Sequence, residues 1–111
     1  MLPATFYNDV YDVVRQIPTG KVTSYGAIAK FLGTGSSARL VGWAMNNAHN
    51  ITPKVPAHRV VNRNGMLSGK MHFNTPTTME DLLKAEGVVV VEDTIENFSE
   101  VFWNPTEMLT I

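Results

Sequence analysis

The sequence predicts a mainly α fold, a winged-helix-like domain that combines a helix-turn-helix with a small β-hairpin in a single domain over residues 1–111. Two observations carry this prediction. Apolar residues recur at helical spacing in three stretches before residue 48, and a short glycine-rich break separates the second stretch from the third. Further along, Asn64-Gly65, a pair typical of hairpin turns, lies between two short apolar runs.

Residues 5–17 are expected to form the first helix. Thr5 is the expected N-cap, and Pro18-Thr19-Gly20 ends the helix because proline and glycine interrupt helical hydrogen bonding. The apolar positions recur every three or four residues and are Phe6, Val10, Val13, Val14 and Ile17. This spacing predicts one buried face along the helix.

The helix-turn-helix is expected between residues 23 and 47. Thr23 or Ser24 caps a helix that runs to about Leu32, since a hydroxyl before an apolar-periodic stretch accepts hydrogen bonds from first-turn amides. The break is Gly33-Thr34-Gly35, after which Ser36 or Ser37 caps a third helix through about Asn47. The side chains expected to face inward from this helix are Leu40, Val41, Ala44 and Met45.

The sequence of the second half of the chain predicts a β-hairpin that forms a wing, followed by a helix and a strand. Val60-Val61 and Met66-Leu67 are expected to pair across the turn at residues 62–65. Residues 76–86 form a helix that Gly87 ends, and residues 88–91 form an apolar strand. Three aromatic residues of the acidic tail are expected to pack back on the body, namely Phe98, Phe102 and Trp103.

Charge is segregated along the chain, although the formal net charge is only −1. No acidic residue lies between Asp12 and Glu80, whereas eight of the nine basic residues do. They are Arg15, Lys21, Lys30, Arg39, Lys54, Arg59, Arg63 and Lys70. Segregation of this kind predicts a positively charged face, which is the electrostatic signature of phosphate binding.

No apolar run approaches the roughly 18 residues of a membrane span, and the first residues lack a signal-peptide layout. The sequence also has no cysteine, so it has no disulfide and no thiolate metal site. We therefore expect no membrane partner and a cytoplasmic location in a bacterium, associated with the nucleoid when bound, or a nuclear one in a eukaryote.

The strongest chemical signal is the segment Val55-Pro56-Ala57-His58-Arg59-Val60-Val61. It resembles Pro-Cys-His-Arg-Val-(Val/Ile), the active-site signature of the O6-alkylguanine-DNA alkyltransferases, which remove an alkyl group from guanine onto their own cysteine. Here Ala57 stands at the nucleophile position. A site without its cysteine resembles the alkyltransferase-like proteins, non-enzymatic relatives that bind alkylated DNA and pass it to nucleotide excision repair.

The resemblance extends from about residue 6 to residue 91. Residues 20–26 are similar to the family's segment ahead of the DNA-reading helices, residues 38–45 to its recognition helix, and residues 82–87 to the helix end that supplies a glutamate to the active-site histidine. The resemblance implies a hydrogen-bonded pair of His58 and Glu86 under the pocket floor. The residues it places against DNA are Thr23, Ser24, Tyr25, Ala38, Arg39 and Gly42.

Two of these residues resemble the parts of a base-flipping device. Arg39 resembles the arginine that enters the base stack in place of the extruded nucleotide, and Tyr25 resembles the tyrosine that crowds the flanking phosphate. Trp43 shares a helix face with Arg39, and we expect it to pack in the core rather than against the groove. Asn47 is taken as the family's hinge asparagine.

Dealkylation needs a thiolate nucleophile, and Ala57 offers only a methyl group. We therefore expect reversible binding of duplex DNA that carries O6-alkylguanine, by a monomer without cofactor or metal, with nucleotide excision repair proteins as further partners. The small side chain of Ala57 predicts tolerance for alkyl groups larger than methyl. The residues expected to line this lesion pocket are Val55, Pro56, Ala57, Arg59, Met66 and Ser68.

Two other interpretations remain open. A winged-helix regulator that binds a specific DNA sequence would explain the basic segment and the helix-turn-helix but not the Pro56–Arg59 segment or Glu86. An alkyltransferase that uses another nucleophile, such as His58, would be an enzyme. Binding that depends on the lesion indicates the alkyltransferase-like protein, and binding that depends on the DNA sequence indicates the regulator. Loss of the alkyl group indicates the enzyme.

Overall fold

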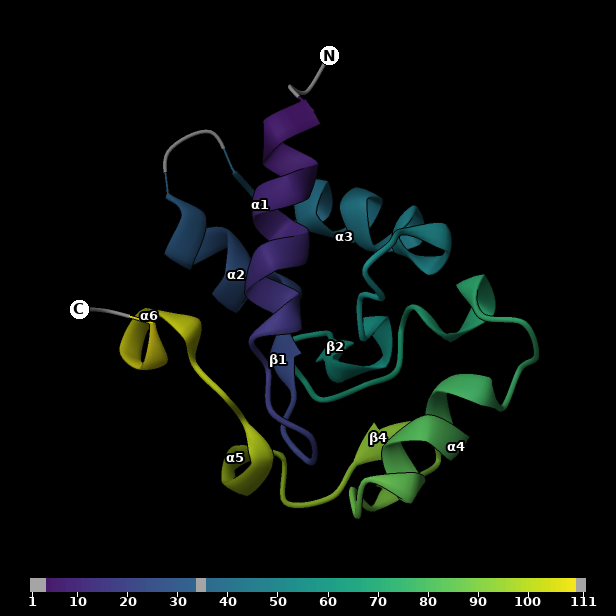
Figure 1. The fold of residues 1–111 in the computed structure, drawn as a ribbon. Helices are drawn as coiled ribbons and strands as arrows, with labels where there is room; N and C mark the ends of the chain where they lie inside the picture. Colours follow the sequence, from purple (N-terminus) through teal and green to yellow (C-terminus); the bar gives the residue numbers. More distant parts are fainter. Residues whose placement is uncertain (1–3, 34–35, 110–111) are drawn as a thin grey trace.

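Helix α1 (Ala4–Arg15) packs against the helix pair α2 (Tyr25–Leu32) and α3 (Ala38–Asn46) in the computed structural model, which describes residues 4–33 and 36–109 (Figure 1). The predicted apolar face of α1 is buried, and the Tyr11 hydroxyl donates to the Ala44 carbonyl of α3 at 3.0 Å. The helix begins at Ala4, so Thr5 lies in its first turn and is not the N-cap.

The helix-turn-helix pair forms as predicted, and both caps are serines. The Ser24 hydroxyl accepts from the Ala27 amide at 3.1 Å, and the Ser37 hydroxyl accepts from the Leu40 amide at 3.2 Å. Val41, Ala44 and Met45 are buried under α3, while Leu40 is half-buried. The predicted break includes Thr34 and Gly35, which lie outside the described residues.

The strand pairing differs from the predicted wing. Strand β2 (Val60–Val61) pairs in parallel with β1 (Thr23–Ser24), with Thr23 opposite Val60. The turn at residues 62–65 does form, because the Asn62 side chain accepts from the amides of Asn64 and Met66 at 2.9 Å. Met66 then bridges to Thr94 and forms no ladder with β2. Burial of both valines between helices favours the parallel partner.

The small hairpin of the fold lies later in the chain. Strands β3 (Val90–Val91) and β4 (Thr94–Ile95) pair antiparallel across Glu92 and Asp93, which both have positive φ. Helix α4 (Thr78–Ala85) precedes them and ends before Gly87, whose φ of 88° is the left-handed conformation expected of a C-terminal glycine. The predicted class, mainly α with a helix-turn-helix and a small hairpin, is therefore confirmed.

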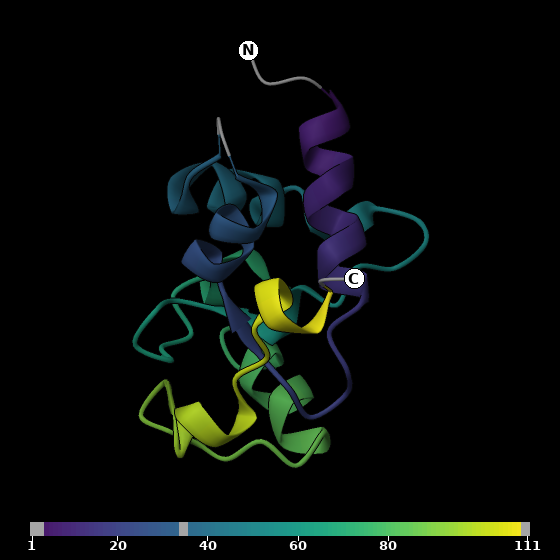
Figure 2. The ribbon, with the colours of Figure 1, turned by 90° about the vertical axis from the view of Figure 1, so that its left-hand side faces the viewer.

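Two buried clusters hold these elements together. One joins side chains of α1, α2 and α3, and the other joins side chains of α4 and the hairpin. Helix α4 and the hairpin lie at the lower end of the molecule in both views (Figures 1 and 2). The tail packs back as predicted: Trp103 is buried in the first cluster, and its amide donates to the Val22 carbonyl at 2.7 Å. Helices α5 (Phe98–Val101) and α6 (Pro105–Met108) flank this contact.

Three 3-10 turns complete the part of the chain that the structure describes: η1 (Ala48–Asn50), η2 (Ala57–Arg59) and η3 (Lys70–His72). Turn η2 contains the segment with the strongest chemical signal, and the other two turns bring His49 and His72 to the cavity beside Ala57. None of the helices described here has the length and apolar character needed to cross a membrane.

Candidate functional site

The segment that carries the chemical signal folds as turn η2 directly ahead of β2. The Arg59 amide donates to the Pro56 carbonyl at 3.0 Å, and the Ala57 amide donates to the Val55 carbonyl at 2.8 Å. Ala57 and His58 are both buried. Successive side chains of a 3-10 turn point about 120° apart, so Ala57, His58 and Arg59 face different surroundings.

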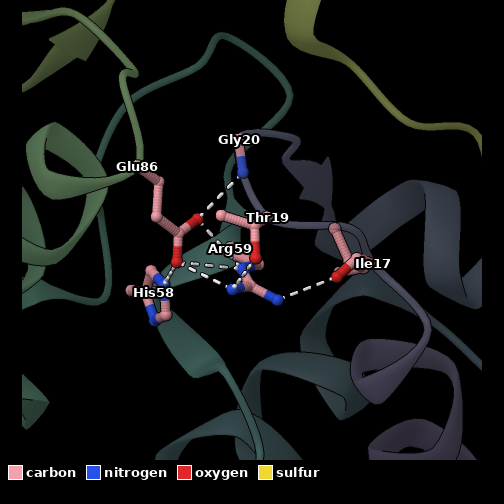
Figure 3. Close-up of polar contacts among 6 residues, drawn as sticks. All are labelled: Ile17, Thr19, Gly20, His58, Arg59 and Glu86. Carbon is pink, nitrogen blue, oxygen red and sulfur yellow. Dashed lines mark hydrogen bonds and ion pairs between the residues drawn. The ribbon is translucent and has the colours of Figure 1, made fainter.

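Glu86, at the end of α4, is the acceptor on which this turn converges (Figure 3). His58 Nε2 lies 2.6 Å from Glu86 Oε2, as the resemblance implied. Arg59 donates to the same carboxylate through Nε at 3.0 Å and Nη2 at 2.8 Å, and the Gly20 amide donates to Oε1 at 3.1 Å. One carboxylate thus joins η2, α4 and the segment that follows α1.

Arg59 has further acceptors besides Glu86. Its guanidinium also donates to the Ile17 carbonyl at 2.9 Å and to the Thr19 hydroxyl at 3.1 Å (Figure 3). The side chain is only 15% exposed, and a buried guanidinium requires acceptors for its several donors. Arg59 thus serves the junction around Glu86, and its place in a lesion pocket stays a prediction.

The protonation states of the pair follow from these contacts. Burial by itself would raise the pKa of Glu86, but hydrogen bonds from Arg59, His58 and the Gly20 amide lower it to about 2. Burial lowers the pKa of His58, and the hydrogen bond with Glu86 opposes this effect. At neutral pH the carboxylate is ionised, so Nε2 of a neutral His58 donates to it and Nδ1 keeps a lone pair.

A small cavity of about 10 Å³ adjoins Ala57. Side chains from α2, α3, η1, β2, η3 and α4 surround it. Its lining consists of Tyr25, Met45, Asn46, His49, Ala57, Val60, Gly69, His72, Phe73 and Met79. A cavity of this volume holds about one water molecule, so a base can enter only if the surrounding loops separate.

Of the six residues predicted for the lesion pocket, Ala57 lines this cavity. Val55 is buried without reaching it, and Met66 and Ser68 are exposed. Pro56 and Arg59 line a separate cleft of about 420 Å³ instead. For Arg59 the physical reason is the 3-10 geometry of η2, which turns its side chain to another face than that of Ala57.

Tyr25 and Gly69 meet over the cavity. A Cβ atom on Gly69 would lie 2.8 Å from the Tyr25 hydroxyl, so only glycine permits this approach. Burial raises the pKa of Tyr25, and a hydrogen bond with Ser68 opposes the shift. Tyr25, the tyrosine assigned to base flipping, is thus the first residue of α2 and packs against the loop at residues 66–73.

Several lining residues carry no signal in the sequence. His49 and His72 belong to no motif, and only the tertiary fold brings η1 and η3 together at Ala57. The asparagine at the cavity is Asn46, whereas Asn47, the residue predicted as the hinge, is exposed and donates to the Trp43 carbonyl at 2.9 Å.

Helix α3 presents a solvent-exposed face. Ala38 and Arg39 are exposed, and the Arg39 guanidinium lies over the Trp43 ring, 5.3 Å from its centroid. Trp43 is 46% exposed, which corrects the prediction that it packs in the core. A Cβ atom at Gly42 would meet nothing within 4 Å, so this face has open space beside the helix backbone.

Thr23 and Ser24 are not on this face. Both are buried, since they form β1 and the Ser24 hydroxyl caps α2. Their side chains are therefore buried in this conformation, and the predicted contact of these two residues with DNA stays a prediction. Among the described residues, Thr23 Oγ1 is a buried hydroxyl that lacks a hydrogen-bond partner.

The basic segment is partly neutralised by acidic residues. Arg15 pairs with Asp12 at 3.0 Å, Arg59 with Glu86 at 2.8 Å, and Lys70 with Asp93 at 2.6 Å. The other five basic residues of the segment are exposed: Lys21, Lys30, Arg39, Lys54 and Arg63. A positive surface must rest on these five.

Comparison with known proteins shows which family and which structures this chain resembles. The family described as 6-O-methylguanine DNA methyltransferase, DNA binding domain, matches residues 5–88. Alkyltransferase-like protein 1 of Schizosaccharomyces pombe is 40% identical over 104 residues, covering 90% of this chain and 95% of that protein. A DNA base-flipping protein of Vibrio parahaemolyticus is 39% identical over 87 residues, covering 78% and 84%. The crystal structure of S. pombe Atl1 in complex with damaged DNA containing O6-carboxymethylguanine superposes with a TM-score of 0.77 at 38% identity, covering 95% of this chain and all of that one.

Proposed function

Because this chain belongs to the 6-O-methylguanine DNA methyltransferase family and is similar to its alkyltransferase-like members, we propose that it binds O6-alkylguanine in duplex DNA and leaves the alkyl group in place. The observation that carries the proposal is the site around Ala57. A methyl group lines the cavity at the nucleophile position, next to His58 and Glu86 in hydrogen-bond contact, in a chain without cysteine.

Lesion binding is supported by the exposed face of α3 and by the relatives. Arg39 stands on that face beside open space at Gly42, where it can enter a base stack. Extruding a base costs a few kcal/mol, and the cost is lower for a damaged, poorly paired base. The S. pombe relative was crystallised with damaged DNA, and the Vibrio relative is named for base flipping.

Retention of the alkyl group follows from the chemistry of the site. Transfer to protein requires a nucleophile that attacks the alkyl carbon, and the thiolate is the side chain suited to it. His58 keeps a lone pair on Nδ1, but no thiol is present for it to deprotonate. The complex with DNA is therefore reversible, and the lesion remains for a later repair step.

The proposal also covers the repair step after binding. A monomer seated on an intact lesion marks the site for nucleotide excision repair proteins, as the similarity to alkyltransferase-like proteins suggests. For this role the protein would act at the nucleoid in a bacterium or in the nucleus of a eukaryote.

The test compares one duplex sequence with and without a single O6-methylguanine. Fluorescence anisotropy should show tighter binding to the lesion duplex in several flanking sequences, and the masses of protein and oligonucleotide should be unchanged after prolonged incubation. A protein that gains the mass of a methyl group is an enzyme. Binding that depends on the flanking sequence and ignores the lesion indicates a regulator instead.

A further inference from the structure

Two histidines line the Ala57 cavity from different segments. His49 belongs to η1, which follows the exposed helix α3, and His72 belongs to η3, in the loop that carries Gly69. Both residues are also exposed, so they stand at the mouth of the cavity. The His49 ring meets the Phe73 ring edge-on with centroids 4.6 Å apart, which fixes its position.

The lining is free of acidic and basic side chains other than these histidines. Its titratable groups are Tyr25 from α2, His49 from η1 and His72 from η3. Burial lowers the pKa of His49, and the charge of a protonated His72 lowers it further. An anion beside both rings would offset the burial and the repulsion together, and imidazole N–H groups are suitable donors to it.

An O6 substituent is the group that would meet these rings. In the proposed function, the flipped guanine directs its O6 substituent toward Ala57, the position of the missing nucleophile. An uncharged methyl group would make only apolar contacts there, with Ala57 and Val60 among others. A longer substituent would meet the same lining, in which His49 and His72 are the side chains that can carry a positive charge.

Resting on the proposed function, we infer that His49 and His72 form a subsite for the O6 substituent that favours substituents ending in a carboxylate. The carboxylate accepts hydrogen bonds from the two imidazoles, and His49 takes up a proton as it binds. His72 lies in the loop at residues 66–73 and His49 follows α3, so a carboxylate bound by both would join two separate segments of the chain.

Proton uptake gives the subsite a measurable signature. A bound carboxylate raises the pKa of His49 in the complex relative to the free protein. Affinity for the anionic lesion therefore increases as the pH falls through about 7 to 6, by up to roughly tenfold per pH unit for one proton taken up. A neutral substituent of the same shape produces no such increase.

The experiment measures anisotropy of one duplex that carries O6-carboxymethylguanine, O6-carbamoylmethylguanine or O6-methylguanine at the same position, between pH 8 and pH 5.5. The carbamoyl group matches the carboxylate in shape but has no charge. The ratio of carboxymethyl to carbamoylmethyl affinity cancels general effects of pH on DNA binding. We expect this ratio to rise about tenfold from pH 8 to pH 6.

His49→Gln and His72→Gln are the matched variants, because glutamine still donates hydrogen bonds but does not titrate. Each should reduce the rise in the ratio, and the double variant should abolish it, with His58 unchanged as the remaining histidine. Circular dichroism verifies that the variants fold. The ratio in the unaltered protein tests the inference by itself if they do not.

The outcomes separate the two proposals. A ratio that stays flat with pH in the unaltered protein, while all three lesions still bind more tightly than undamaged DNA, overturns the subsite and leaves the proposed function intact. A rise that persists in the double variant also overturns it. Binding that ignores every lesion overturns the proposed function.

Discussion

Replacing Glu86 by glutamine keeps the shape of the side chain and removes the charge that three donors share. In the native protein Arg59, His58 and the Gly20 amide all donate to this carboxylate. A glutamine has one acceptor oxygen, and its amide group would face at least one of the same donors. The substitution therefore leaves the Arg59 guanidinium largely buried without its counterion.

Two routes give the same magnitude for this change. The pKa of Glu86 falls from 4.5 to about 2 on folding, and at about 1.4 kcal/mol per pKa unit this is roughly 3 kcal/mol of stability at neutral pH. Removing one partner of a buried ion pair costs about 3–5 kcal/mol in other proteins. The Glu86 side chain is 13% exposed, so screening by solvent is limited. We expect a loss of about 3 kcal/mol, or roughly 10–20 °C in Tm for a domain of this size.

The pH dependence has a definite sign. Because the pKa of Glu86 is lowered by folding, its contribution is complete above about pH 4.5 and is lost as the pH falls toward 2. Burial lowers the pKa of His58, so the unfolded chain takes up a proton below about pH 6.5 that the native protein resists, and stability also falls there. In Glu86→Gln the decline below pH 4.5 should shrink.

Urea unfolding followed by circular dichroism at pH 7, 5 and 3 measures both effects. The matched control is Glu80→Gln on the same helix, because Glu80 pairs with Lys84 at 2.6 Å on the surface. Such an exposed pair contributes about 0.3–0.5 kcal/mol. If Glu86→Gln were no more destabilising than Glu80→Gln at pH 7, the assignment of Glu86 as the central acceptor would be refuted.

Single contacts and exposed charges give three further predictions. Arg39→Ala should weaken binding to lesion DNA about ten- to a hundredfold, since stacking contributes about 1–3 kcal/mol. The control Lys30→Ala, also at an exposed residue, should change the affinity for lesion and normal duplexes equally. If anisotropy shows an unchanged lesion preference in Arg39→Ala, Arg39 is an ordinary surface charge. Thr23→Val should leave the free energy of unfolding in urea unchanged or raise it by up to about 1 kcal/mol, because Thr23 Oγ1 has no hydrogen-bond partner in the described part of the chain. The affinity for DNA should not change. A clear loss of stability would reveal a hydrogen bond of this hydroxyl. With about four of the five exposed basic residues on phosphates, log K should fall with log salt with a slope of roughly −4, and a slope near zero would contradict phosphate binding.

The helices and their ends are the part of this fold that local chemistry determines. Ser24 and Ser37 cap α2 and α3 through bonds to amides three residues away, and Gly87 adopts the left-handed conformation that follows α4. The sequence pattern contains both partners of each of these contacts. They were therefore predictable without knowledge of the rest of the chain.

The strand partners and the cavity lining were not predictable in this way. The turn at residues 62–65 formed as expected, but Val60 pairs with Thr23, because burial between helices outweighed the local hairpin signal. Similarly, the resemblance placed Ala57 at the cavity but could not give the orientation of Arg59, which depends on the 3-10 turn. His49 and His72 meet only through tertiary structure.

The junction around Glu86 bears on how such sites persist. His58 and Glu86 resemble the active-site histidine and glutamate of the dealkylating enzymes, yet here they and Arg59 tie together three segments that are distant in the sequence. Ala57 makes no side-chain contribution to that junction, so the nucleophile position can change while the scaffold stays intact. Selection for stability is by itself a reason to keep the histidine, the arginine and the glutamate. In this chain the contacts of His58 and Arg59 thus belong to the folding of the domain, and Ala57 is the position on which reactivity depends.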